Sequence, residues 1–286
     1  MSGPVERSES RTTEVAGLAV RRALPRRGRR TVGAWCFVDH FGPADTEAAM
    51  AVGPHPHIGL QTVTWLVTGE VLHRDSLGSE QLIRPGQLNL MTAGWGVAHA
   101  EESPAGPTAG LHGAQLWVAQ PDATRTGAPA FEHHRELPEL DTGPVHTTVL
   151  LGAIDGAGSP ARADTPLLGL AVSGSGDAVL PVRADFEHAL VVLDGTVSVG
   201  AEVVRPGELA YLATGRDELP LHVEPDSHAL VLGGEPFPEP LRMWWNFVGR
   251  SPEELDEAGR EWNAGHERFG PVASTLPRIP APTDTR

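Results

Sequence analysis

The second half of the chain repeats the sequence pattern of the first half, and this repeat limits the folds that the chain can adopt. Residues 84–88 (RPGQL) have a counterpart at residues 205–209 (RPGEL), and a strand-like stretch ending at Gly69 has one ending at Gly195. The spacing of roughly 120 residues is too long for a solenoid and fits a duplicated domain. Residues 62–68 alternate polar and apolar side chains except at Leu66 and are rich in β-branched residues, which is typical of a strand. We therefore expect two copies of an all-β domain.

Composition and charge narrow the class of protein further. The chain has 33 glycines and 26 prolines, which fits many strands joined by tight turns. It contains no lysine and carries a formal net charge of -15, so it is a poor candidate for direct nucleic-acid binding. A single cysteine, Cys36, excludes an internal disulfide. We find no apolar run of membrane-spanning length and no signal peptide. We expect a cytoplasmic, monomeric protein without membrane contact.

An arginine-rich run at residues 21–30 allows two interpretations. It could bind nucleic acid or another anionic ligand. It could instead form a turn whose arginines pair with the many carboxylates of an acidic protein. No aromatic residues interleave with the arginines to stack on bases. We therefore favour the turn.

Two short pairs of residues provide candidate metal ligands. His55 and His57 are two residues apart, as are His99 and Glu101, so each pair shares one face of a strand. If both faces look into the same barrel, three imidazoles and one carboxylate converge. This donor set leaves positions open on Fe(II), Mn(II), Ni(II) or Co(II), and its ligand types also accept Cu or Zn. One inward histidine is more often a hydrogen-bonded core residue, but two pairs favour a metal site.

The same alternation predicts what surrounds this site. Counting back in steps of two from Trp65 and Val63 places Gln61 and both histidines of the first pair on one strand face. Val63, Trp65 and Trp95 either line the mouth of the barrel, which would suit a flat aromatic substrate, or belong to the core. Gln61 is a candidate to bond a ligating imidazole or bound water, and His73 to be structural or to support a ligand.

Several short motifs, in order along the chain, resemble the pirin family of the cupin superfamily, and in particular its bacterial quercetinase-like members. They are residues 39–43 (DHFGP), 55–57 (HPH), 62–64 (TVT), 69–71 (GEV), 73–78 (HRDSLG), 85–86 (PG), 91–94 (MTAG), 99–101 (HAE) and 243–247 (MWWNF). The resemblance runs from the early thirties to the mid-260s. Gln61 stands where pirins often have Glu, and Ile58 and Leu60 where they often have Arg and Phe. These departures lie beside the expected metal, so the resemblance does not name the substrate.

The resemblance implies an all-β fold of two tandem cupin (jelly-roll) barrels with a short C-terminal helix. We place the metal-binding N-terminal barrel at residues 1–140 and the C-terminal barrel at residues 141–286. A helix is expected over residues 251–264, with Ser251 as the N-cap, Pro252 in the first turn and Glu254 closing a capping box. Residues 1–12 are expected to be disordered, and residues 270–286 to form a loosely packed tail.

The resemblance also implies two alternative functions. With Fe(II) held by the four candidate ligands, the chain would be a dioxygenase that opens the heterocyclic ring of a flavonol such as quercetin with O₂, releasing carbon monoxide. Glu101 is the carboxylate placed to take the proton of the substrate hydroxyl. Alternatively, the chain would be a non-enzymatic regulator whose iron redox state changes its affinity for a cytoplasmic protein partner. We favour the enzyme, because an open metal position suits turnover.

Aligning the two copies on their shared turns predicts that they differ at the site. The second copy has Pro181, Arg183, Pro220 and His222 where the first copy has His55, His57, His99 and Glu101. Proline and arginine side chains do not ligate cations. We therefore expect the C-terminal barrel to bind no metal.

Overall fold

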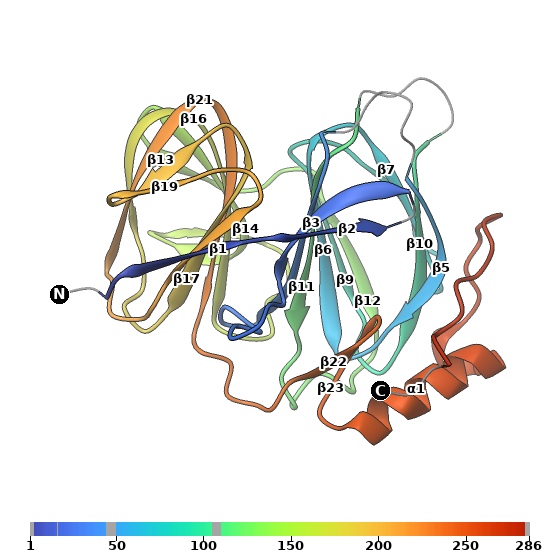
Figure 1. Ribbon diagram of the computed structural model, residues 1–286. Helices are drawn as coiled ribbons and strands as arrows, with labels where there is room; N and C mark the ends of the chain where they lie inside the picture. Colours follow the sequence, from blue (N-terminus) through green and yellow to red (C-terminus); the bar gives the residue numbers. More distant parts are fainter. Residues whose placement is uncertain (1–2, 16, 44–49, 105–109, 284–286) are drawn as a thin grey trace.

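The computed structural model describes residues 3–15, 17–43, 50–104 and 110–283 of the chain. These residues form 23 strands and one α-helix, and all paired strands in the four sheets run antiparallel. Two strand-built halves lie next to each other, with the helix beneath the N-terminal half (Figure 1). Each half is a jelly roll made of packed antiparallel strands, so the predicted fold class is confirmed.

The N-terminal half contains two sheets. The larger one consists, in spatial order, of β12 (Ala130–His134), β9 (Leu88–Thr92), β6 (Leu60–Thr68), β11 (His112–Ala119), β4 (Trp35–Phe41), β3 (Leu18–Leu24) and β2 (Arg11–Val15). The smaller one consists of β5 (Ala51–His57), β10 (Val97–Glu102), β7 (Val71–Asp75) and β8 (Glu80–Ile83). The smaller sheet carries all four candidate ligands, on its neighbouring strands β5 and β10.

The C-terminal half is built on one large, strongly bent sheet. Its main path is β1 (Val5–Glu9), β20 (Glu208–Leu212), β17 (Glu187–Asp194), β21 (Glu218–Gly234), β16 (Leu167–Pro181), β14 (Val145–Ile154) and β13 (Glu139–Thr142). Three short strands attach to it: β15 (Ala157–Gly158), β18 (Val197–Val199) and β19 (Glu202–Val204). The strands β16 and β21 are long enough to take part in both faces of the jelly roll.

An apolar layer joins the two halves. Side chains of β6 and β11 pack there against side chains of β17, β20 and β21 in one buried cluster. Trp35 lies in this layer, and its indole N–H lies 3.1 Å from both the Leu168 and the Gly233 carbonyl oxygens. Val63 and Trp65 belong to the same cluster. They therefore hold the halves together as core residues, which is one of the two roles expected from the sequence, and do not line the barrel mouth.

The N-terminal segment is ordered, so the prediction of disorder for residues 1–12 is wrong for the described part. β1 pairs with β20 of the C-terminal half, with Val5 opposite Leu212, while β2 pairs with β3 of the N-terminal half. Both strands expose most of their side chains, which explains their polar sequence. Their stability comes from backbone pairing at two sheet edges that would otherwise be open.

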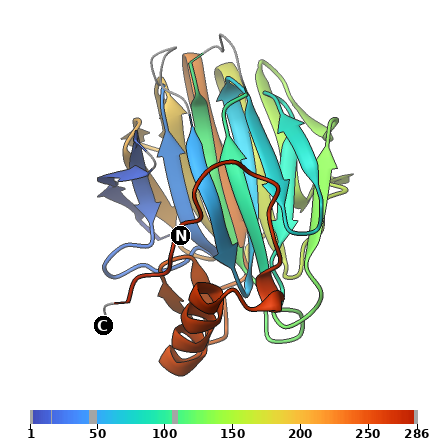
Figure 2. The ribbon, with the colours of Figure 1, turned by 90° about the vertical axis from the view of Figure 1, so that its right-hand side faces the viewer.

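A C-terminal segment returns to the N-terminal half after the second jelly roll ends. It contains the hairpin of β22 (Arg242–Trp244) and β23 (Phe247–Gly249), helix α1 (Pro252–Ala264) and the 3₁₀ turn η1 (Glu267–Phe269). Figure 2 shows this segment running across the outside of the N-terminal barrel. Its apolar side chains form a cluster with Ile58 and Ala98, which lie next to candidate ligands on the chain.

The helix agrees with its sequence prediction. Ser251 is the N-cap and its hydroxyl accepts the Glu254 backbone N–H at 3.3 Å, with Pro252 at the first helical position. The Glu254 carboxylate bonds the Arg250 N–H rather than that of Ser251, so the capping box is displaced by one residue. Trp262 is buried on the face toward the barrel. No helix among the described residues is long and apolar enough to cross a membrane.

The tail after the helix is bound to the barrel around Ile279, so the prediction of a loose tail is wrong for this part, although most of its described residues are exposed. The Ile279 N–H donates to the Pro54 carbonyl at 2.9 Å, and the Trp262 indole N–H donates to the Ile279 carbonyl at 2.8 Å. Gly53 lets this tail approach, since a Cβ there would collide with the Pro277 carbonyl. The tail thereby supports strand β5, which carries His55 and His57.

Candidate metal centre

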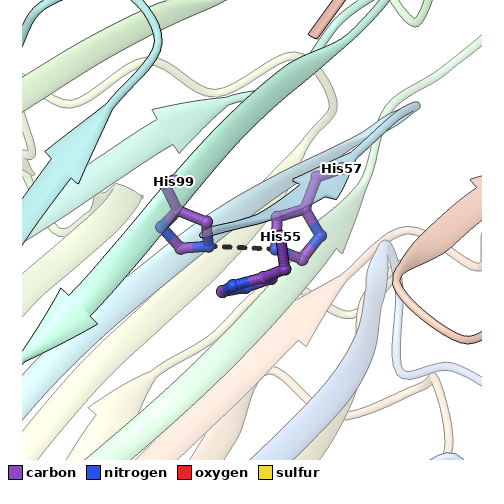
Figure 3. Close-up of side chains that lie close together, drawn as sticks. All are labelled: His55, His57 and His99. Atoms are coloured by element: carbon purple, nitrogen blue, oxygen red, sulfur yellow. Dashed lines mark hydrogen bonds between the residues drawn. The ribbon is translucent and has the colours of Figure 1, made fainter. Parts of the chain in front are cut away.

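Three candidate ligands converge on one point inside the N-terminal barrel. In the antiparallel pair of β5 and β10, His55 lies directly opposite His99, and His57 lies one pleat further along β5. Figure 3 shows the three imidazoles turned toward one another. One ring nitrogen of each lies within 4.8 Å of the others, and all three side chains are buried. The spacing of two residues on adjacent strands therefore produces the predicted cluster.

Glu101, the fourth candidate, lies beside His99. The pairing of β10 with β5 shifts register between His99 and Glu101. A carboxylate oxygen of Glu101 and one nitrogen each of His73 and His99 form a second group within 4.8 Å of one another. The two groups share His99, so the structure brings all four predicted side chains into one buried region. It adds His73, which the sequence placed only in a supporting role.

The hydrogen bonds of His55 and His57 fix which ring nitrogen faces the centre. The Nδ1 atom of His57 lies 2.9 Å from the Asn246 carbonyl oxygen, and that of His55 lies 2.9 Å from the Gly53 carbonyl oxygen. A carbonyl oxygen only accepts, so each Nδ1 carries the proton. Each Nε2 atom is then left with a free lone pair, as metal-binding histidines require.

His99 reaches the same state through a relay. The Asp75 carboxylate accepts the Nε2–H of His73 at 3.2 Å. The Nδ1 atom of His73 then accepts the Nδ1–H of His99 at 3.4 Å, which leaves a lone pair on His99 Nε2. Burial acts to raise the pKa of Asp75, but the hydrogen bonds from His73 and Ser79 together exceed this effect and lower the pKa, which keeps the acceptor ionised.

With these tautomers, the distance between the ring nitrogens shows whether a metal ion fits between them. The Nε2 atoms of His57 and His99 lie only 3.0 Å apart (dashed line in Figure 3). Two facing lone pairs at this distance repel each other unless a cation lies between them. Metal–nitrogen bonds of roughly 2.1 Å at a right angle separate two ligand nitrogens by roughly 3.0 Å. The arrangement therefore fits a bound metal ion.

Burial keeps the imidazoles neutral. It lowers the pKa of His55 to about 4, and it lowers the pKa values of His57 and His99 well below the ordinary range, with a further contribution from neighbouring imidazoles. Neutral imidazoles are the form that binds metals. Burial also raises the pKa of Glu101. The Thr64 hydroxyl lies 3.5 Å from this carboxylate and 2.8 Å from the Gln115 side-chain oxygen.

A pocket of about 510 Å³ opens onto the three imidazoles. Phe37 and Trp117 stack in one wall with ring centroids 4.0 Å apart, and Trp117 meets the His57 ring edge at 5.2 Å. Trp245 lies at the turn of the β22–β23 hairpin, with an unusual φ of 53°, and also lines the pocket. The pocket thus combines metal donors with flat aromatic walls.

The side chains predicted to surround the site point elsewhere. Gln61 bonds the Thr92 hydroxyl and the Arg162 carbonyl, so it contacts neither an imidazole nor the pocket. The cause is Gly59, whose φ of 65° interrupts the alternation between β5 and β6 and moves odd-numbered residues to the opposite face. Trp95 is half exposed outside the pocket, under the Arg268 guanidinium.

Several pocket residues were not anticipated from the sequence. Gln115, Phe37 and Trp117 line the pocket and come from strands whose inner face was not assigned from the sequence. Asn246, which orients His57, lies 189 residues away along the chain. Nothing in the HPH motif predicts this contact with Asn246, although Asn246 belongs to the MWWNF motif.

Comparison with known proteins agrees with this geometry. Residues 17–118 match the family model described as Pirin, and residues 168–270 match the Pirin C-terminal cupin domain. A Pseudomonas aeruginosa protein named "Putative quercetin 2,3-dioxygenase" is 49% identical over 97% of this chain and 90% of its own length. A pirin-like protein of Caulobacter vibrioides is 34% identical over 91% of this chain and 93% of its own.

Solved structures show the same fold. The crystal structure of quercetin 2,3-dioxygenase from Acinetobacter baumannii matches with a TM-score of 0.93 and 40% identity, covering 99% of this chain and 97% of that one. A bacterial pirin from Escherichia coli, solved in complex with nickel(II), matches with a TM-score of 0.64 and 18% identity over 82% of this chain and all of its own, a likeness of fold alone. With both halves matched in order and relatives aligned along nearly its whole length, the chain belongs to the pirin family.

Proposed function

We propose that this protein is a metal-dependent dioxygenase of the quercetinase type, with His55, His57, His99 and Glu101 as the metal ligands. One observation carries the proposal: three neutral imidazoles present their lone pairs at the base of an aromatic-walled pocket. Fe(II) is the metal we propose. The donor types also accept Mn, Ni, Co, Cu and Zn. Relatives named for quercetin 2,3-dioxygenase activity support this choice of reaction.

A bound metal would act as a Lewis acid toward the hydroxyl of a flavonol and provide a position for O₂. The protein supplies the remaining functions. Glu101 lines the same pocket as the three imidazoles, so a carboxylate oxygen is placed to accept the hydroxyl proton. The Thr64 hydroxyl lies 3.5 Å from this carboxylate, and Gln115 lines the same pocket.

The pocket walls suit a flat aromatic substrate. The stacked rings of Phe37 and Trp117 provide a planar apolar surface next to His57. Trp245 provides a further aromatic wall from the β22–β23 hairpin. Apolar walls also exclude water from the reacting atoms, which strengthens the electrostatic interactions within the pocket.

The proposal is tested by loading the protein with Fe(II) under anaerobic conditions, adding quercetin and admitting O₂. We expect the flavonol absorption to disappear, with one O₂ consumed and one carbon monoxide released per quercetin. A His57→Ala/His99→Ala double variant treated in the same way should leave quercetin unchanged. Absence of O₂ uptake by the loaded wild-type protein with quercetin and related flavonols would overturn the proposal.

The alternative of a redox-sensing regulator makes the opposite prediction. Such a protein would consume no O₂ with flavonols, and oxidation of its iron would change its binding to a cytoplasmic protein partner. The open pocket above the imidazoles favours the enzyme, because a regulator does not need space for an aromatic substrate at its metal.

A further inference from the structure

The arginine-rich run folds into a rigid turn that borders a second hollow, separate from the metal pocket. Arg26 and Arg29 exchange backbone hydrogen bonds of 2.9 and 3.2 Å around Arg27 and Gly28, whose φ is 85°. The hollow has a volume of about 790 Å³. We call it the arginine cleft; its charged lining residues are Glu9, Arg11, Arg22, Arg26, Arg27 and Arg30.

Carboxylates neutralise only part of the arginine-rich run. Arg22 is bound to Asp39 by two hydrogen bonds of 2.7 Å, and Arg29 is bound to Glu6 at 2.9 Å. For these two the pairing expected from the sequence is confirmed. Arg22 also stands over the ring of Phe37 at 4.4 Å, so it forms the wall between the cleft and the metal pocket.

The other cleft arginines are left without anionic partners. Among the described residues, the side chains of Arg11, Arg26 and Arg27 form no hydrogen bond or ion pair, although Arg11 acts on Asp39 through space. Arg30 donates only to the Leu241 carbonyl, at 3.4 Å. Four arginines of the cleft therefore have no anionic partner among the described residues. Glu9 is the only carboxylate among the described residues that line the cleft. In a chain of net charge -15, this is an unusual concentration of positive charge.

We propose that the arginine cleft binds a small anion that carries two or more phosphate groups. Guanidinium groups bind phosphate oxygens in pairs, and several converging arginines favour a multivalent anion over a single charge. The backbone-bonded turn fixes the backbone of Arg26 and Arg27 before binding, which reduces that part of the entropy cost. The strongly acidic remainder of the molecule repels a long nucleic acid but not a compact ligand.

The test is calorimetric titration with tripolyphosphate at low ionic strength. Wild-type protein should show saturable binding that weakens with added salt. An Arg26→Gln/Arg27→Gln variant should bind at least about tenfold more weakly, because it loses charge-assisted hydrogen bonds. Arg26→Lys/Arg27→Lys should fall between the two, since it keeps the charge but loses the paired geometry.

Two control variants show whether binding is specific to the cleft. Arg135→Gln/Arg260→Gln removes the same charge from exposed positions outside the cleft and should bind within about twofold of wild type. His57→Ala/His99→Ala should also bind normally, because the cleft is independent of the metal. The inference is overturned if wild type shows no saturable binding, or if either control loses as much as the Arg26→Gln/Arg27→Gln variant. It is equally overturned if an oligonucleotide of equal charge binds more than about tenfold tighter than tripolyphosphate.

Discussion

The two jelly rolls differ in the side chains that their equivalent strand segments turn toward the interior. In the N-terminal half, β5 and β10 turn His55, His57, His99 and Glu101 toward the interior. In the C-terminal half, the end of β16 pairs with the start of β21, and the buried side chains there are the aliphatic Leu180, Leu219 and Leu221. At these segments the first interior carries polar side chains held by hydrogen bonds. The other is apolar and stabilised by burial, at about 1.5–3 kcal/mol for each large side chain.

This difference refines the reason why the second copy was expected to lack a metal site. The sequence alignment placed Pro181, Arg183, Pro220 and His222 at the ligand positions, but all four are exposed. The Arg183 guanidinium bonds Asp185 and Glu235 at the surface, so it cannot repel an interior cation. The inward positions are aliphatic instead. We still expect this barrel to bind no metal, because the side chains that point inward are leucines, which offer no ligand atom.

The largest effect is expected from the carboxylate of the polar interior. Glu101→Gln removes a base that is buried beside the imidazoles, and we expect quercetin-dependent O₂ uptake per bound metal to fall by roughly 10²–10⁴-fold. Metal content is measured in parallel, because a weakened ligand would lower it as well. His222→Gln, at the aligned position of the other barrel, should leave the rate unchanged. Similar rates per bound metal in both variants would contradict the role given to Glu101.

The next prediction compares one buried aromatic ring next to the candidate metal centre with one in the core of the C-terminal half. Trp262→Ala removes a buried ring from the cluster beneath Ile58 and Ala98, and Phe186→Ala removes one from the C-terminal core. Each should lower the free energy of unfolding by about 3–5 kcal/mol. Only Trp262→Ala should weaken metal affinity, because its cluster packs next to His57 and His99. Denaturant unfolding and metal titration on both variants check this, and equal metal affinities would show that the helix does not support the site.

The smallest effect is expected from a single polar group inside the apolar barrel. His188 is fully buried, both ring nitrogens lack a partner among the described residues, and burial lowers its pKa to about 4. A depressed histidine pKa stabilises the fold above about pH 6.5, and this contribution is lost as the pH falls toward 4. His188→Leu should therefore lose about 2 kcal/mol less stability than wild type between pH 7 and pH 5.

Urea unfolding of chelator-treated protein at both pH values measures this difference. His146→Leu, which changes an exposed histidine of the same half, serves as the control. If the pH dependence of His188→Leu equals that of wild type, His188 is not buried in its neutral form.

The sequence was most informative where the signal is local. The spacing of two residues predicted that His55 and His57, and His99 and Glu101, share strand faces, and the Ser-Pro-x-Glu pattern predicted the start of the helix. The internal repeat predicted two all-β copies. The shared strand faces and the helix start each depend on residues within one strand or one turn, whereas the repeat is visible because two distant stretches carry the same short pattern.

The predictions that the structure contradicts share a physical cause. Each concerns a feature that depends on backbone geometry or on contacts between residues far apart in the chain. A single positive φ at Gly59 was enough to invert the predicted faces of Gln61, Val63 and Trp65. The tail at Ile279 is ordered by a bond to Pro54, which no local pattern encodes. The Asn246 carbonyl reaches His57 only because the C-terminal hairpin returns to the first barrel.

The central claim, that one barrel holds the metal and the other does not, is tested most directly by elemental analysis. Protein purified without chelator and loaded with Fe(II) under anaerobic conditions should contain one metal ion per chain. His57→Ala/His99→Ala should contain none. Two metal ions per wild-type chain, or one retained in the double variant, would contradict this account.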